Sequence, residues 1–473
     1  MTIYEPGNLL NRTIPTPAAN LALQISSGKV IMVSGAGVSK AAPTNLPLGA
    51  EIAHILKDKL SHTDLQAVVK DIADDNLLSI ADAAEMKSQA ALRLIQKMIL
   101  DSFEFKTARP NYAHRCIALL MAERASSVMT TNWDTCIERE ANVGYCDLIA
   151  CRRQEELGGS GNSAVLLKLH GCATLEESIR VSSEQVREIW WAGHQISAAI
   201  ERDWVVFLGI GSIAPYIKDT IKTIISLSKE HTQILVVDLS LSEEWDELMA
   251  GQNGSFFICD SAEKFLDDII SSLTLNQFAQ VTILAKKLET EGHIASIDLA
   301  RAANQTLSFL GKYPAHFLWL WVRRGIFPKI CCRAVLESNF VRYLLAMAYI
   351  NTISSLQSMQ IISNAVSIIC KDFIIELAWA KEVYTSDVLC KIKEESLLAD
   401  RQNNVIPAGI PCVIIVNDPL GPLPAATMPE SVVDTPDIQG IIDGPRTLAV
   451  RWLSLDQLLT IKNIDELHTL LGV

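Results

Sequence analysis

The sequence predicts an α/β fold in which a Rossmann-like, doubly wound parallel sheet with an inserted helical lobe is followed by an all-helical domain and a small mixed C-terminal appendage. Between Lys29 and about Asp268, short β-rich apolar runs alternate with helical patterns, which is typical of a parallel sheet with helices on both faces. The runs are apolar at successive positions, as expected for strands that helices cover from both sides. Beyond about Thr274, apolar residues recur at helical spacing instead.

Six runs have the character of buried strands. About ninety residues of mainly helical pattern separate the first run from the second, among them GAEIAHILKDKL, DLQAVVKDIADD and AALRLIQKMILDSF. This insertion predicts a helical lobe beside the sheet. The strand-like runs are VIMVS at 30–34, SVMT at 127–130, AVLLKLH at 164–170, WVVFLGI at 204–210, ILVVDL at 234–239 and FFIC at 256–259.

The chain of 473 residues is longer than one hydrophobic core usually covers. We expect three domains: the sheet domain at 1–275, a helical regulatory or partner-binding domain at 276–400, and a small mixed region at 401–473. The helical expectation rests on runs such as ICCRAVLESNFVRYLLAMAYI and AVSIICKDFIIELAWAKEV. In the last region several prolines surround a single strand-like run, CVIIV, before a final helical DELHTLL.

Composition excludes several classes of protein. Hydrophobic residues make up 49% and charged residues 20%, which is an ordinary globular balance. The formal charge of -13 makes direct binding to nucleic acid or an anionic membrane unfavourable. The most apolar stretches are shorter than the ~18 to 20 residues that span a bilayer, and the N-terminus lacks the pattern of a signal peptide. The eleven cysteines include no C-x-x-C pair, so we expect no metal, and reduced thiols in a cytoplasmic protein.

The first candidate site is a glycine turn, VIMVSGAGVSKAA, in which a buried strand runs directly into Gly35-Ala36-Gly37-Val38-Ser39. Two glycines let the backbone turn sharply and approach a pyrophosphate, and the Ser39 hydroxyl can donate to it. The G-x-G-x-x-G fingerprint is incomplete, because Lys40 occupies the third glycine position. A tight strand-to-helix turn without a ligand is the alternative.

The second candidate is SVMTTNWDTCIERE, where a strand ends in Thr130-Thr131-Asn132-Trp133-Asp134. An amide and a carboxylate two residues apart suit hydrogen bonding to sugar hydroxyls, which need both donors and acceptors. The alternative is a helix cap, since Thr or Asn caps a helix and an Asp in its first turn suits the dipole.

The third candidate is AVLLKLHG, where His170 ends a buried strand. Open α/β sheets bind ligands at the carboxyl ends of their strands, and an imidazole transfers protons near neutral pH. A histidine packed in the core is the alternative. By contrast, His114 in NYAHRCIALL falls on a predicted helix, which favours packing over chemistry.

Two later strand ends add weaker signals. Gly209, Gly211 and Ser212 follow WVVFL, and Asp238 ends ILVV, where an acid can accept from a ribose hydroxyl. The chain contains no G-x-S-x-G, G-x-x-x-x-G-K-[ST] or H-E-x-x-H motif, which disfavours α/β hydrolases, P-loop enzymes and zincins.

In this order, GAGVS, TTNWD, KLHG, GIGS and VVDLS resemble the SIR2 (sirtuin) superfamily, and in particular its divergent bacterial branch found in antiphage defence systems. The resemblance covers roughly residues 25–270. It implies that Asn132 holds the nicotinamide ribose of NAD and that His170 acts as the base near the ribose hydroxyls. The residues that it implies for NAD binding are Gly35, Ala36, Gly37, Ser39, Thr131, Asp134, Gly209, Gly211, Ser212 and Asp238.

Two departures bear on the activity that the resemblance implies. Protein deacylases of the family carry a four-cysteine zinc ribbon, which this chain lacks, and an Asp-Phe-Arg stretch after the glycine turn, where this chain reads KAAPTNLPLGAE. The defence-type members are closer, which implies hydrolysis of NAD to nicotinamide and ADP-ribose. A deacylase or ADP-ribosyltransferase, and a non-catalytic NAD-binding sensor, remain as alternatives.

The resemblance also implies regulation, because unrestrained loss of NAD would kill the host cell. We therefore expect an activation-dependent effector of antiviral defence that acts by abortive infection. A regulatory protein partner or a nucleotide signal would act through the helical and C-terminal regions, and we expect a homo-oligomer.

Overall fold

The computed structural model describes the chain in segments. These are residues 3–142, 146–159, 163–187, 203–211, 215–228, 231–250, 252, 254–291, 298–324, 331, 333, 335–336, 338–353, 358–362, 365–369, 373–379, 410–417, 432–434 and 447–471. The chain divides into two compact units: one comprises residues 1–6, 13–273 and 330–333, and the other residues 7–12, 274–329 and 334–473. The three-domain division expected from the sequence stays a prediction.

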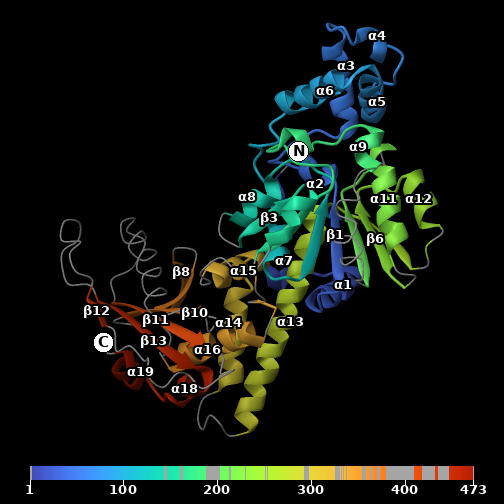
Figure 1. The fold of residues 1–473 in the computed structure, drawn as a ribbon. Helices are drawn as coiled ribbons and strands as arrows, with labels where there is room; N and C mark the ends of the chain where they lie inside the picture. Colours follow the sequence, from blue (N-terminus) through green and yellow to red (C-terminus); the bar gives the residue numbers. More distant parts are fainter. Residues whose placement is uncertain are drawn as a thin grey trace. The chain divides into compact units, whose positions relative to one another are not determined.

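The first unit is built on a seven-stranded sheet in which every neighbouring pair is parallel (Figure 1). The order β3-β4-β2-β1-β5-β6-β7 places β1 in the middle, with the chain building first on one side of it and then on the other. This confirms the α/β class and the doubly wound parallel sheet. The strands are β1 Val30–Ser34, β2 Ser126–Thr130, β3 Leu148–Cys151, β4 Ala164–Lys168, β5 Trp204–Leu208, β6 Gln233–Asp238 and β7 Ser255–Cys259.

The edge strand β3 is absent from the six strand-like runs of the sequence. Its segment LIAC is only four residues long, and all but Cys151 are partly exposed. A short edge strand lacks the long apolar run by which a central strand is recognised.

Helices cover the sheet on both faces, because its strands are apolar at successive positions. On one face, Ile221 and Ile224 of α11 and Trp245 of α12 pack against Val33 and Phe207. Figure 1 shows α11 and α12 (green) beside the sheet. Outside the helical lobe, the described helices of this unit with seven or more residues are α1 Thr16–Ser26, α7 Tyr112–Ala122, α8 Cys136–Asn142, α11 Pro215–Leu227, α12 Glu243–Met249 and the first part of α13 Ala262–Thr290.

The insertion between β1 and β2 forms the expected helical lobe with a core of its own. Ile52, Leu56, Ile80, Ile95 and Ile99 belong to this core and are at most 3% exposed. Two of its helices begin at side-chain caps that satisfy free backbone N–H groups. The lobe comprises α3 Gly49–Leu60, α4 Gln66–Val69, α5 Leu77–Lys87 and α6 Gln89–Ser102.

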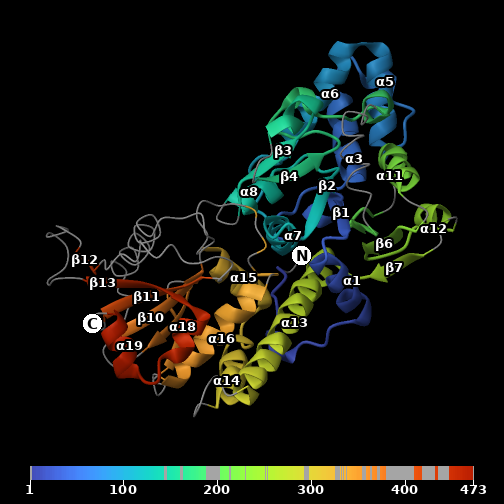
Figure 2. The same ribbon diagram turned by 60° about the horizontal axis from the view of Figure 1, so that its bottom comes forward.

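The second unit begins with helices, as expected, and continues into a six-stranded sheet of order β12-β13-β11-β10-β9-β8. Pairs β10–β11 and β11–β13 are parallel, and the others are antiparallel. Figure 2 shows β10, β11 and β13 side by side, with α16 and α18 next to them. The elements are α14 Leu299–Leu310, α15 Ala315–Arg324, α16 Ser338–Ile353, β8 Ser358–Ile362, β9 Ala365–Ile369, β10 Phe373–Trp379, β11 Ile410–Asn417, β12 Val432–Asp434, β13 Thr447–Ser454, α18 Leu455–Thr460 and α19 Ile464–Leu471.

The helical interpretation of AVSIICKDFIIELAWAKEV was wrong. Strands β9 and β10 lie in this segment and pair antiparallel, Ile375 opposite Ile368. The segment consists of two short apolar runs rich in β-branched residues, and such runs fit the pleated surface of a sheet. Periodicity alone does not separate runs of this length from buried helix.

Among the described residues, no helix is both long and apolar enough to cross a membrane.

Candidate functional site

The carboxyl ends of the central strands bring most of the predicted site residues to one edge of the sheet. Ser34 pairs with Thr130 on one side and with Leu208 on the other, so the residues that follow, Gly35, Thr131 and Gly209, leave neighbouring strands together. The chain reverses its direction of winding at β1, and open α/β sheets bind ligands at such a point. Of the predicted residues, Ser212 lies outside the described part of the chain.

The two predicted glycine turns cross in direct contact. The Gly37 N–H donates to the Gly209 carbonyl at 2.7 Å, and a Cβ added to Gly37 would lie 2.6 Å from that oxygen. Gly209 has a φ of +59°, and its own Cβ would lie 2.7 Å from the Val38 nitrogen. Both positions therefore require glycine. This contact fixes the turn between β1 and the short helix α2 (Ala36–Lys40) against the turn that follows β5.

The buried hydroxyl of Ser39 is the centre of a polar network. It donates to Asp134 Oδ2 at 2.8 Å, accepts from Asn132 Nδ2 at 3.1 Å, and lies 3.1 Å from His114 Nε2. His114 Nδ1 accepts from the Asn111 N–H at 3.2 Å, so the proton of the neutral ring is on Nε2 and is donated to Ser39. A hydroxyl has one proton and two lone pairs, and all are used here. In this state Ser39 holds protein groups together, whereas the sequence predicts a contact with NAD.

The network fixes the orientation of the Asn132 amide. Its Nδ2 group donates to the Gly35 carbonyl at 2.9 Å and to Ser39 Oγ at 3.1 Å, which uses both amide protons. The carbonyl Oδ1 is therefore the group that the amide can present to a ligand, as an acceptor. The Asn132 backbone is fixed as well, since its N–H donates to Thr130 Oγ1 at 3.1 Å.

Asn132 lines a partly enclosed, narrow cavity whose interior volume is about 30 Å³. One wall is polar and combines the strand-end loops with α2, while the other is apolar and includes residues from the helical lobe. Phe105 and Trp133 meet edge to face on this wall, with ring centroids 5.7 Å apart. The lining residues are Ala36, Ser39, Leu46, Pro47, Gly49, Ile52, Phe105, Thr131, Asn132, Trp133, Asp134 and Ile217.

The cavity wall carries one buried negative charge. Burial by itself raises the pKa of Asp134, but attraction to the His114 ring when it is protonated, the Lys168 charge, and hydrogen bonds from Cys136 N and Ser39 outweigh it, so the pKa lies below its ordinary value. Burial lowers the pKa of His114 to about 4, against the attraction of Asp134. Near neutral pH the carboxylate is thus ionised and the imidazole neutral.

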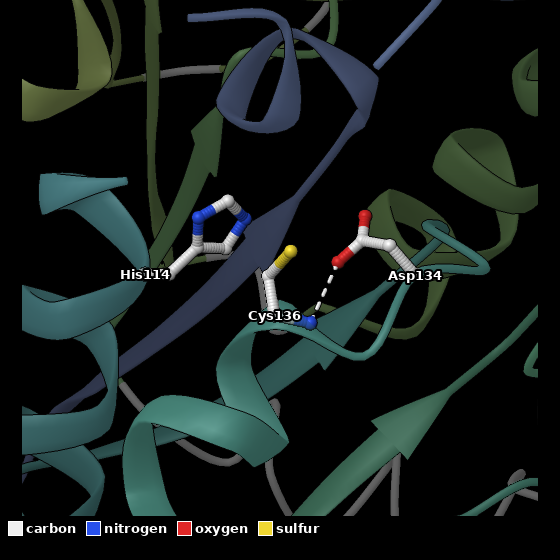
Figure 3. A group of neighbouring side chains, drawn as sticks. All are labelled: His114, Asp134 and Cys136. Atoms are coloured by element: carbon white, nitrogen blue, oxygen red, sulfur yellow. Dashed lines mark hydrogen bonds between the residues drawn. The ribbon is translucent and has the colours of Figure 1, made fainter. Parts of the chain in front are cut away.

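His114, Asp134 and Cys136 form a group whose potential ligand atoms lie within 4.8 Å of one another (Figure 3). The figure shows the Cys136 N–H donating to Asp134, at 3.0 Å from Oδ1. The chemistry of this group is that of a hydrogen-bond network, since His114 Nε2 carries a proton and burial raises the pKa of the Cys136 thiol far above its ordinary value. Ser39 already bridges His114 and Asp134.

His170 lies beside the cavity rather than on its wall. Its side chain is 0% exposed, and Nε2 lies 2.9 Å from the Thr220 hydroxyl on α11. Burial, with a smaller effect of the Arg180 charge, lowers the pKa of His170 to about 3, so the ring is neutral. Its backbone carbonyl accepts from Trp133 Nε1 at 3.0 Å, which ties the end of β4 to the Asn132 loop.

Asp238 organises the second glycine turn. Its Oδ2 accepts from the Gly211 N–H at 2.5 Å, and its Oδ1 accepts from the Leu239 N–H at 2.8 Å. Trp245 Nε1 donates to the Gly211 carbonyl at 3.2 Å. The carboxylate therefore stands at the end of β6 beside the turn that follows β5, and its contact with a ribose stays a prediction.

Three residues of this region have no role in the expectations from sequence. His114 could have been found from its spacing to Asn111, because an Asn and a His three residues later form a reciprocal cap at the start of α7. Lys168 is the first residue of the KLHG motif, and a lysine at the end of a buried strand is itself a signal. Thr220 carries no such signal, since only the fold brings α11 to His170.

Comparison with known proteins matches residues 126–251 to the SIR2-like domain family. This span contains four of the five motifs and begins after the first glycine turn. Among solved structures, a complex of a SIR2 homologue with NAD is 13% identical and covers 56% of this chain and 95% of its own, with a TM-score of 0.28. A complex of a Sir2 homologue variant with ADP-ribose is 14% identical, covers 53% and 94%, and has a TM-score of 0.30. The search of curated proteins found no match.

Proposed function

We propose that the parallel-sheet unit binds NAD and hydrolyses its nicotinamide glycosidic bond, releasing nicotinamide and ADP-ribose. The observation that carries this proposal is the convergence of the glycine turn and the Asn132 loop on one cavity, with the Asn132 amide held so that Oδ1 is its acceptor. The match of residues 126–251 to the SIR2-like domain family supports it.

The arrangement suits the chemistry of this bond. Nicotinamide leaves as a neutral molecule from a cationic pyridinium, so no strong acid is required. The enzyme has to stabilise an oxocarbenium-like ribose and to position the attacking water. Asn132 Oδ1 would accept from a ribose hydroxyl or from that water. The ionised Asp134, which also lines the cavity, favours the positive charge that develops on the ribose.

His170 would act as the base, at the ~10² to 10⁴-fold scale of general-base catalysis. The ring is neutral near pH 7, but with a pKa of about 3 it is a weak base in this state, so its pKa has to rise when substrate binds. In the state described here its Nε2 is engaged by Thr220. A substrate hydroxyl or water must therefore replace the Thr220 hydroxyl before His170 takes part.

The biological part of the proposal rests on the sequence resemblance. We propose that the activity is switched on during infection, that NAD depletion then aborts infection, and that a protein partner or nucleotide signal acts through the second unit on a homo-oligomer. Cellular NAD measured after phage infection, in cells with and without the chain, tests this. We expect NAD to fall only when chain and phage are both present, and a fall without phage contradicts the restraint.

Water as the acceptor is tested by incubating the purified chain with NAD in the presence of candidate activators, with and without an acylated peptide. We expect nicotinamide release that does not depend on the peptide, with ADP-ribose as the second product. Release that requires the peptide identifies a deacylase or a transferase instead. NAD bound without release under either condition identifies a non-catalytic sensor.

A further inference from the structure

Lys168 is a buried lysine to which the proposed chemistry gives no role. It is the last residue of β4, and its side chain is 1% exposed. A lysine is seldom buried in this way unless its charge is paired. Its position is next to the proposed site, because Lys168 pairs with Thr130 at the end of β2.

The Lys168 ammonium connects the Asn132 loop, residues 131–135, to helix α8, which follows it. Nζ donates to the backbone carbonyl of Asp134, and to Glu138 Oε1 at 2.9 Å. Glu138 stands in the first turn of α8, and its side chain is 14% exposed. Hydrogen bonds from a charged donor are shorter and stronger than neutral ones, so this lysine holds the carbonyl of Asp134 firmly.

The charge on Lys168 is maintained by its surroundings. Burial alone would lower the pKa of Lys168, but Glu138, together with Cys172 and Asp134, raises it above its ordinary value. The ammonium is therefore protonated near neutral pH. The negative charge of Glu138 compensates the positive charge of Lys168, and this attraction offsets the free-energy cost of burying the ammonium.

The Asp134 carbonyl is a fixed point in the loop that carries Asn132. Elsewhere the loop is held by neutral bonds: the Thr131 N–H donates to the Ser34 carbonyl at 3.1 Å, and the Thr135 N–H donates to the Phe105 carbonyl at 3.2 Å. Among the described hydrogen bonds to the loop backbone between Thr131 and Thr135, the bond from Lys168 is the one whose donor carries a charge.

We propose that Lys168 is a positioning residue that sets the place of Asn132 Oδ1 in the cavity by fixing the Asp134 carbonyl, and that Glu138 serves to neutralise it. The effect on turnover rests on the proposed NAD hydrolysis, whereas the effect on the order of the loop does not. A lysine that only stabilised the fold would affect stability without affecting the loop in a stable variant.

The test separates these two roles with a paired substitution. Lys168→Met alone leaves the Glu138 carboxylate buried without a cation, which is strongly destabilising. The double variant Lys168→Met/Glu138→Gln removes both charges and still lacks the donor to Asp134. As a matched control we choose Lys57→Met/Asp74→Asn in the helical lobe, because Lys57 also donates to a backbone carbonyl and to a carboxylate.

Two readouts are measured on full-length chains that melt within a few degrees of wild type. Amide hydrogen exchange of residues 131–136 is expected to be at least about 10-fold faster in the Lys168 double variant, and unchanged in the control. For nicotinamide release, we expect kcat to fall about 10-fold or more while KM for NAD changes less than about 3-fold.

If the amides of the loop exchange as slowly in the double variant as in wild type, the positioning role is overturned. A kcat equal to that of wild type overturns it as well. If no chain releases nicotinamide with candidate activators present, the NAD hydrolysis proposal fails, and the exchange measurement still decides the role of Lys168.

Discussion

Mild acid should destabilise the parallel-sheet unit, because it contains two buried histidines that are neutral in the folded chain. The pKa is about 4 for His114 and about 3 for His170, against 6.5 for an exposed histidine. Both groups have a lowered pKa, so above pH 6.5 neither state of the chain takes up a proton. As the pH falls below 6.5, the unfolded chain binds two protons that the folded chain refuses, and stability is lost.

The size of the effect follows from proton linkage. Between pH 6.5 and pH 4.5, each histidine removes about 2 kcal/mol from the free energy of unfolding, and the two together remove about 4 kcal/mol. That is a large part of the ~5 to 15 kcal/mol that stabilises a typical domain. The ionised Asp134 does not contribute in this window, because its pKa is lowered and its stabilisation is lost only below about pH 4.

Urea unfolding of the full chain at pH 6.5, 5.5 and 4.5 measures this loss. The double variant His114→Gln/His170→Gln should be less stable at pH 6.5, since it loses the bonds to Ser39 and Thr220, but its stability should depend much less on pH. His62→Gln, at an exposed position, is the control and should follow wild type. If the double variant loses as much stability as wild type between pH 6.5 and 4.5, the histidines are not the cause and the account of the buried network is wrong.

Three further changes probe the site. Gly37→Ala should cost about 3 kcal/mol of stability or more, because its Cβ would lie 2.6 Å from the Gly209 oxygen. Gly211→Ala should cost only the ~1 to 2 kcal/mol of its positive φ, because its Cβ would meet no atom within 4 Å. Thermal melting compares the two variants, and equal losses contradict the crossing of the turns. Thr220→Val should raise basal nicotinamide release several-fold by freeing His170 Nε2, and slower release would give Thr220 a supporting role instead. Asp238→Asn should raise kcat/KM for NADP relative to kcat/KM for NAD by about 10-fold, because a carboxylate repels a 2′-phosphate. An unchanged preference would show that Asp238 does not lie next to the ribose.

The parallel sheet could be predicted because each of its central strands is a run of apolar residues ending in a turn. VIMVS is fully buried, and WVVFL is buried except for its first residue. The strands of the segment at 365–379 could not be predicted, because pairing with neighbouring strands decides between helix and strand there. Ile368 and Ile375 are both buried and lie opposite each other on neighbouring strands, and the pattern of one strand alone does not contain that pairing.

For the site, the sequence predicts which residues meet but not how their polar groups are paired. Asn132, Asp134 and Ser39 are brought together as expected. That the Ser39 hydroxyl is fully used within the protein depends on His114, which arrives from a helix 75 residues away in the chain. Burial of His170 against α11 likewise depends on packing between distant segments.

Nicotinamide release from NAD by wild type, Asn132→Ala and His170→Ala, measured with candidate activators present, tests the proposed hydrolysis most directly. The exposed Asn142→Ala and His62→Ala are matched controls. We predict release by wild type and both controls, and a loss of about 100-fold or more in each site variant, the scale on which removing one group that stabilises or deprotonates a transition state acts. Release at the wild-type rate by Asn132→Ala and His170→Ala would contradict the account.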